Sequence, residues 1–141
     1  MRLWHKDLIP VLPRQQLLSQ WRECCCIARN ILDKGTPNHM LVNKVLTYPK
    51  WHFAKYAIEV AKEMERRGYK VDRYKFFKLF DKWDDGTIKT KDVAHDELFE
   101  CWHNIRYLKQ NYYNLMEKYD CGGISKDEWI IIQEYITNYF I

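Results

Sequence analysis

The chain has 141 residues, and its apolar and aromatic content, which includes six Trp and ten Tyr, excludes an intrinsically disordered protein. Lys and Arg number 23 against 19 Asp and Glu, so the net charge of +4 permits binding to a polyanion without demonstrating it. We expect a single domain over residues 1–141 and no membrane span, because no apolar run approaches the ~20 residues that a spanning helix needs.

The best-delimited predicted element is a helix over residues 14–34, preceded by a short N-terminal arm. Pro13 suits a helix start, because its ring fixes a helical φ and its missing N–H would have had no partner there; Gly35 follows the far end. The apolar residues that recur at helical spacing predict one stripe facing a core: Leu17, Leu18, Trp21, Cys25, Ala28 and Leu32. Glu23 lies on the opposite face, where the pattern alone describes a solvated carboxylate.

The rest of the chain predicts further helices joined by short connections, and no strand. In order, we expect a turn at 35–37, a short helix over 39–46, a helix that opens at 48–49 and stops at 68, a helix and a turn within 72–91, and a long helix from about 93 to 121–123. Ser125 and Glu128 form a capping box that starts a final helix. The sequence therefore predicts an all-α, compact single-domain fold, with the N-terminal arm packed against the first long helix.

Two further expectations concern which faces are buried. Ile105 and Tyr139 belong to apolar stripes of the two C-terminal helices and are expected to face inward. In the helix that opens at 48–49, basic residues alternate with Glu59, Glu63 and Glu65, which favours a solvated face.

The patterns typical of metal sites are absent or incomplete. Residues 81–92 imitate a calcium loop, but Trp83 stands where an oxygen ligand is needed and Asp92 is shorter than the bidentate Glu of such loops, so we interpret the segment as a turn. The histidines have no metal-binding spacing: His5, His39, His52, His95 and His103. The five cysteines form no Cys-x-x-Cys pair, which favours free thiols in a reducing cytoplasm.

The run Leu17-Leu18-Ser19-Gln20-Trp21-Arg22-Glu23 resembles the start of the pyrimidine-dimer DNA glycosylases of the phage endonuclease V type. In that family a hydrophobic pair, an aromatic residue and then Arg-Glu stand on the first long helix, at the same distance from the N-terminus. The likeness continues more weakly through residues 38–44 and 65–69 and at 95–97, and residues 1–10 look most like the bacterial branch. It covers about the first half of the chain.

The resemblance implies a DNA glycosylase with AP lyase activity that acts on UV-induced pyrimidine dimers in double-stranded DNA. It implies no metal and no organic cofactor, no obligate protein partner, and a cytoplasmic protein that joins the nucleoid when it binds DNA. The N-terminal α-amine, here that of Met1, would attack the sugar and form a Schiff base, with Glu23 as the catalytic carboxylate. An α-amine suits this role because its pKa of ~7.7–8.0 leaves a useful fraction unprotonated near neutral pH, unlike a lysine at ~10.4.

By the same resemblance, Arg22 would contact DNA phosphates, with Arg2 and Arg29 behind it. Simple solubility explains Arg2 and Arg29 equally well, since only Arg22 belongs to the shared motif.

The sequence also departs from the phage-type pattern. The bulky Arg2 follows Met1 where a small residue permits removal of the methionine, Gln16 stands in place of a histidine, and residues 138–141 replace an aromatic and basic tail. Two alternatives therefore stay open: a non-catalytic damaged-DNA-binding module, and a glycosylase for a different damaged base.

Overall fold

The computed structural model describes residues 2–34, 39–84 and 93–140, which fold into helices without any strand. This confirms the all-α expectation. In chain order the elements are the 3-10 helix η1 (Lys6–Val11), α1 (Arg14–Lys34), α2 (Met40–Leu46), α3 (Lys50–Arg66), α4 (Tyr74–Asp84), the 3-10 helix η2 (His95–Glu97), α5 (Ile105–Asp120) and α6 (Lys126–Phe140). None of these helices combines the length and the apolar composition that crossing a membrane requires.

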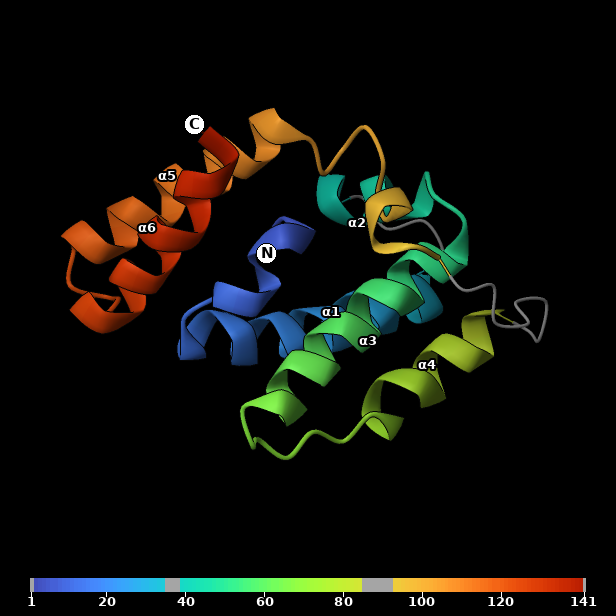
Figure 1. Cartoon of the computed structure of the whole chain (residues 1–141). Coiled ribbons are helices and arrows are strands. Elements are labelled where there is room, and N and C mark those ends of the chain that lie inside the picture. Colours follow the sequence, from blue (N-terminus) through green and yellow to red (C-terminus); the bar gives the residue numbers. More distant parts are fainter. Residues whose placement is uncertain (1, 35–38, 85–92, 141) are drawn as a thin grey trace.

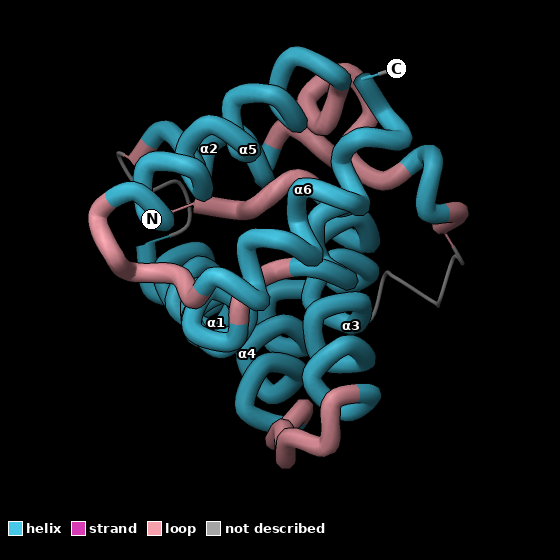
Figure 2. Tube along the Cα trace, turned by 60° about the vertical axis from the view of Figure 1, so that its left-hand side comes forward, coloured by secondary structure: helices cyan, strands magenta, loops and turns pink. Residues whose placement is uncertain are grey.

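The helices form two groups with the start of the chain between them. Helices α1, α3 and α4 pack side by side, while α5 and α6 form a separate antiparallel pair (Figures 1 and 2). The N-terminal arm and η1 lie between the two groups, where η1 contacts α3 and α6 (Figure 1). The first residues of the chain are thus part of the interior, as the predicted packing of the arm against α1 requires.

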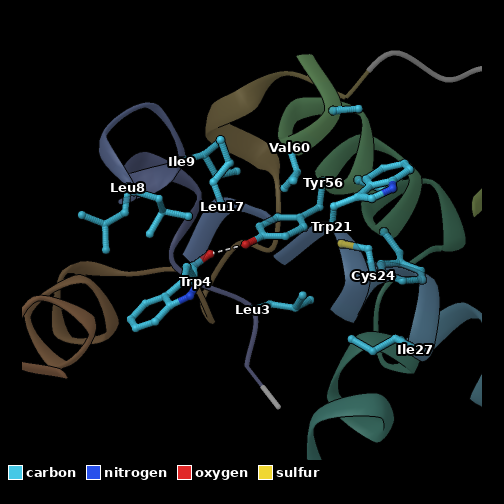
Figure 3. Close-up of a cluster of buried hydrophobic side chains, with 14 of the residues drawn as sticks. Leu3, Trp4, Leu8, Ile9, Leu17, Trp21, Cys24, Ile27, Tyr56 and Val60 are labelled. Carbon is cyan, nitrogen blue, oxygen red and sulfur yellow. Dashed lines mark hydrogen bonds between the residues drawn. The ribbon is translucent and has the colours of Figure 1, made fainter. Parts of the chain in front are cut away.

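The apolar residues of the arm belong to the main core. Leu3 and Leu8 are fully buried, and with Trp4 and Ile9 they belong to the same core cluster as side chains of α1 and α3 (Figure 3). The members of this cluster from α1 and α3 include Leu17, Trp21, Cys24, Ile27, Tyr56 and Val60. Burial of a Leu side chain contributes about 1.5–3 kcal/mol to the free energy of folding, so the buried side chains of the arm stabilise its docked position.

The start of α1 follows the sequence prediction and is held from outside the helix. The carbonyl of Pro13 accepts the first helical hydrogen bond from Leu17 N at 2.9 Å. The backbone N–H of Arg14 donates to Glu128 Oε2 at 2.8 Å. Glu128 also completes the predicted capping box, since its own N–H donates to Ser125 Oγ at 3.2 Å and its Oε1 accepts from Ser125 N at 3.3 Å. Burial raises the pKa of Glu128, but the hydrogen bonds from Arg14 and Ser125 outweigh it and lower that pKa overall.

The prediction of a long helix from about Val93 is wrong, because residues 98–104 form turns and bends and not a helix. Phe99 and Cys101 have positive φ angles of 51° and 69°, and α5 begins only at Ile105, where Asn104 Oδ1 caps it by accepting from Tyr107 N at 2.9 Å. The Phe99 side chain is fully buried, and the backbone N–H of Phe99 donates to His52 Nδ1 at 3.0 Å. These tertiary contacts override the helical pattern of the sequence.

Two burial expectations also fail. Ile105 is 53% exposed and Tyr139 is 37% exposed, because they lie in the first and last turns of their helices, beyond the core. Glu63 is not on a solvated face: it is buried, and it pairs with Arg66 and Arg67. The predicted turn at 35–37 lies outside the described residues.

Candidate active site

Side chains from several helices hold the backbone of the arm over residues 2–6. Three backbone carbonyls of the arm accept hydrogen bonds: Arg2 O from Gln20 Nε2 at 2.8 Å, Leu3 O from Tyr107 OH at 2.7 Å, and Trp4 O from Tyr56 OH at 2.6 Å. Three backbone N–H groups of the arm donate hydrogen bonds: Trp4 N to Gln20 Oε1 at 2.7 Å, His5 N to Asn111 Oδ1 at 2.7 Å, and Lys6 N to His103 Nδ1 at 2.9 Å. A backbone run outside a helix or sheet ladder has to satisfy its polar groups in another way, and here side chains do so. The path of the arm is therefore specified residue by residue.

The groups that hold the arm keep one protonation state near neutral pH. Burial, followed by the nearby charges of His5 and Lys6, lowers the pKa of His103 to about 2, so its imidazole is neutral. Because Nδ1 accepts the bond from Lys6 N, the ring proton resides on Nε2. Burial raises the pKa values of Tyr56 and Tyr107, so both keep the hydroxyl proton that they donate.

The arm leads to a pocket of about 300 Å³, which we call the arm-start pocket. It is lined by Arg2, Trp4, Ser19, Gln20, Glu23 and Lys118, from the arm, α1 and α5. The cationic side chains Arg2 and Lys118 thus share a small hollow with the carboxylate of Glu23. This combination can hold an anion while keeping a general base or a charge-stabilising carboxylate at hand.

Glu23 is only half-buried, yet one of its carboxylate oxygens is enclosed. Oε2 is buried and has no hydrogen-bond partner among the described residues. The face of α1 opposite the apolar stripe is covered by the arm at Gln20, so Glu23 is not the freely solvated carboxylate that the pattern alone describes. A buried carboxylate oxygen without a partner costs stability, which makes such a group a candidate for a functional role.

The other candidate residues from the sequence separate into two groups. Arg2 lines the arm-start pocket, with its guanidinium 4.7 Å from the centroid of the Trp4 ring. Arg22 is exposed at the rim, where its Nη2 donates to Ser19 Oγ at 3.1 Å. Arg29 is exposed about 10 Å further along α1 and does not line the pocket. Met1, the predicted source of the amine, lies outside the described residues; its neighbour Arg2 lines the pocket together with Glu23.

Four lining residues were not candidates from the sequence: Trp4, Ser19, Gln20 and Lys118. Gln20 belongs to the motif run, but its spacing gave no sign that both ends of its amide would bind the arm. Lys118 lies on α5, and nothing in the sequence links this position to Glu23. Only the packing of α5 over the arm brings it there.

The described residues contain no group of three or more His, Cys, Asp or Glu side chains arranged to hold a metal ion. His5, His52 and His103 are buried. Of the calcium-like segment 81–92, residues 81–84 belong to the end of α4, and residues 85–92 lie outside the described part of the chain.

The sequence of this chain matches one known protein family. The profile of the family described as pyrimidine dimer DNA glycosylase matches residues 1–76, more than half of the chain. The match contains the arm, α1 and α3, and thus every lining residue of the arm-start pocket except Lys118. Neither a curated protein nor a solved structure matches the chain significantly.

Proposed function

The chain belongs to the pyrimidine dimer DNA glycosylase family, and on this premise we propose that it excises UV-induced pyrimidine dimers through a Schiff base formed by the α-amine of Met1. Glycosylase chemistry breaks the bond between C1′ and the 5′ base of the dimer, which stays joined to the 3′ base through the dimer itself. The same site then cleaves the strand as an AP lyase. Glu23 is the catalytic carboxylate.

One observation carries the proposal. The arm is held by its backbone from Arg2 to Lys6, and Arg2 lines a pocket where Glu23 presents a buried oxygen with no partner among the described residues. Enzymes gain rate by fixing reacting groups before the reaction, because positioning alone can supply about 7–11 kcal/mol of the barrier. An arm fixed in this manner suits a reaction that uses the chain terminus.

The chemistry follows from an amine beside a carboxylate. The unprotonated amine attacks C1′ of the sugar, the C1′–base bond breaks, and the base leaves with the bonding electron pair and takes up a proton. The amine loses its proton and the sugar ring opens, which gives the iminium. Glu23 stabilises the positive charge on sugar and iminium and relays these protons.

The iminium then makes strand cleavage possible. It acidifies the C2′ protons, so loss of one of them expels the 3′ phosphate by β-elimination, and water releases the amine afterwards. No step in this sequence needs a metal ion or an organic cofactor.

Cations around the arm-start pocket fit a DNA substrate. Arg2 and Lys118 line the pocket and Arg22 stands at its rim, and we assign all three to phosphates that flank the lesion. Arg29 extends the same basic row along α1 and contacts DNA further from the lesion. These cations support double-stranded DNA as the substrate.

Borohydride trapping tests the proposal. Protein with its natural N-terminus, verified by intact mass, is mixed with duplex DNA that contains a cyclobutane pyrimidine dimer or an abasic site. We expect a covalent adduct on both substrates, located at Met1 by peptide mass spectrometry, and none with protein whose α-amine has been acetylated.

Each negative result has a distinct meaning. An adduct on the abasic site alone would replace the dimer by another damaged base. Salt-dependent binding to damaged duplex without any adduct would overturn the enzyme assignment in favour of a damaged-DNA-binding module.

A further inference from the structure

The side chain of Gln20 binds the N-terminal arm through both ends of its amide. It is 1% exposed, its Nε2 donates to Arg2 O at 2.8 Å, and its Oε1 accepts from Trp4 N at 2.7 Å. These two hydrogen bonds grip one backbone segment at points two residues apart. They therefore fix both its position and its direction.

The orientation of this amide is dictated by its neighbours. The carbonyl of Arg2 needs a donor and the N–H of Trp4 needs an acceptor, so the two ends of the amide cannot be exchanged. Tyr56 adds a second restraint from α3, because its hydroxyl lies 3.0 Å from Gln20 Oε1 and 2.6 Å from Trp4 O. The Gln20 side chain has a single arrangement that satisfies every partner.

Gln20 also stands on the helix that carries Glu23. The two residues are three apart on α1, so they share a face and differ in height by about 4.5 Å. Among the described hydrogen bonds to residues 2–6 of the arm, only those of Gln20 involve α1. The others involve α3, α5, η2, the segment between η2 and α5, or the arm and η1 themselves. The distance between the arm and the carboxylate is therefore set by one rigid helix at this point.

We propose that Gln20 is a positioning residue that holds the N-terminal α-amine opposite Glu23, with Tyr56 as its support, and this inference rests on the proposed function. The amine belongs to the residue next to Arg2, and adjacent Cα atoms are about 3.8 Å apart, so a grip on Arg2 O limits where the amine can go. Gln20 itself takes no part in bond making or breaking. It acts through the arm.

The first test separates chemistry from DNA binding. In Gln20→Leu, the single-turnover rate of imine formation on dimer-containing duplex should fall about 10- to 100-fold, because a displacement on the order of 1 Å has this effect on positioned groups. The dissociation constant for the same DNA should stay within about 2-fold, since Gln20 binds only the backbone of Arg2 and makes no contact with the side chains of Lys118 and Arg22 in the described hydrogen bonds. Gln16→Leu is the matched control. Gln16 lies one turn earlier on α1, is half-buried and makes no described hydrogen bond to residues 2–6 of the arm, so the rate of this variant should equal the native rate.

If Gln20→Leu fails to fold, Tyr56→Phe serves as the test variant. This substitution removes only the hydroxyl group of Tyr56 and keeps its aromatic ring. It should slow imine formation about 3- to 10-fold, again without a change in DNA affinity.

The second test does not depend on catalysis. The pKa of the α-amine is followed by NMR in protein labelled at methionine, with and without Glu23→Gln. A carboxylate held beside the amine raises the pKa of the amine, so Glu23→Gln should lower it in otherwise native protein. In the Gln20→Leu background, or in Tyr56→Phe, the same substitution should have a much smaller effect.

The outcomes distinguish this inference from the function on which it rests. If native protein forms the adduct and folded Gln20→Leu or Tyr56→Phe forms it at the native rate, the positioning role is overturned and the glycosylase assignment stands. If no protein forms an adduct, the proposed function falls, and the NMR measurement still decides whether Gln20 sets the distance between amine and carboxylate.

Discussion

Two pockets of similar size are lined by residues of the N-terminal arm and η1, and the carboxylates in the two pockets differ in their hydrogen-bond and ion-pair partners. The arm-start pocket has a volume of about 300 Å³ and contains Glu23. The other, which we call the η1 pocket, has about 280 Å³ and lies between η1 and α3, with Glu59, Glu63 and His95 in its lining. Both bring acidic and basic side chains together beside the same segment.

In the η1 pocket each carboxylate has a cationic or imidazole partner. Glu63 accepts from Arg66 Nε at 2.7 Å and lies 3.3 Å from Arg67 Nε. Glu59 lies 3.0 Å from His95 Nδ1, while His95 Nε2 lies 2.7 Å from Asp7 of η1. These pairs connect three segments, η1, α3 and η2, to one another. In the arm-start pocket, by contrast, Glu23 Oε2 has no partner among the described residues.

The comparison separates two uses of the same residue type. A carboxylate whose oxygens are occupied holds elements together, and losing it leaves its partners uncompensated. A carboxylate with an enclosed free oxygen stabilises little, but it can interact with a group that arrives later. We therefore expect substitutions in the arm-start pocket to change activity more than stability, and substitutions in the η1 pocket to do the reverse.

The largest effect is expected for Glu23→Gln. The amide keeps the size of the side chain but loses the charge that stabilises the iminium, so strand cleavage should fall about 1000-fold or more. The free energy of unfolding should change by less than about 0.5 kcal/mol, because no described ion pair is lost. Single-turnover cleavage and urea unfolding measure the two quantities. A variant that unfolds easily but keeps its rate would reverse the comparison.

Glu63→Gln should show the opposite behaviour. It leaves Arg67, whose side chain is only 19% exposed, without its carboxylate partner, and we expect the free energy of unfolding to fall by about 1–3 kcal/mol. Arg67 also donates to Leu12 O at 2.7 Å, so the end of the arm should loosen as well. The cleavage rate of the folded fraction should remain within about 2-fold of native.

Glu65→Gln is the matched control for this substitution. Glu65 pairs with Arg73 on the surface, where exposed ion pairs contribute only about 0–1 kcal/mol. If Glu65→Gln destabilised the protein as much as Glu63→Gln, burial would not explain the difference between the pairs.

Local signals in the sequence accounted for the elements that depend on neighbouring residues. Helix α1 has the predicted bounds because Pro13 favours its start, and the Ser125–Glu128 capping box is present as expected. The run that ends in Arg22-Glu23 also identified the family correctly. Each of these signals lies within a short stretch of chain.

What could not be predicted depends on contacts between distant residues. The segment that contains Phe99 has an apolar pattern typical of a helix. However, the backbone N–H of Phe99 binds His52, 47 positions away, and α5 begins only at Ile105. His103 binds the backbone of Lys6, 97 positions away. Lys118 reaches the arm-start pocket only because α5 packs over the arm, so its role had no local signature.

Arg22→Gln sharpens the comparison at the rim of the arm-start pocket. Loss of one phosphate contact should weaken binding to duplex DNA by about 10-fold or less at low salt, and should reduce the slope of log K against log[salt] by roughly one unit. Arg29→Gln is the comparison variant, since Arg29 is exposed on the same row but outside the pocket. It should weaken binding less and leave single-turnover cleavage unchanged. Equal effects from both would indicate a uniform basic face.

The smallest effect is expected at His95, and it depends on pH. Burial lowers the pKa of His95, but the hydrogen bonds with Asp7 and Glu59 outweigh it and raise that pKa above 6.5. A group with a raised pKa in the folded protein stabilises fully below the unfolded value, and this contribution is lost as pH rises through the folded pKa. The free energy of unfolding of native protein should therefore exceed that of His95→Gln below about pH 6.5, by less than about 1 kcal/mol because the side chain is 42% exposed. The difference should vanish at higher pH.

The buried histidines act with the opposite sign and are nearly the same in both proteins, because burial is the largest cause of their lowered pKa values and the charge of His95 the smallest. Burial lowers the pKa values of His5 and His103, so both favour unfolding as pH falls below about 6.5, in native protein and variant alike. Urea unfolding of the two proteins between about pH 5 and 9 isolates the contribution of His95. Cleavage by folded His95→Gln should match native protein across this range, because the η1 pocket and the arm-start pocket share no lining residue. A pH-dependent loss of cleavage in this variant would show that the two hollows are coupled through the arm.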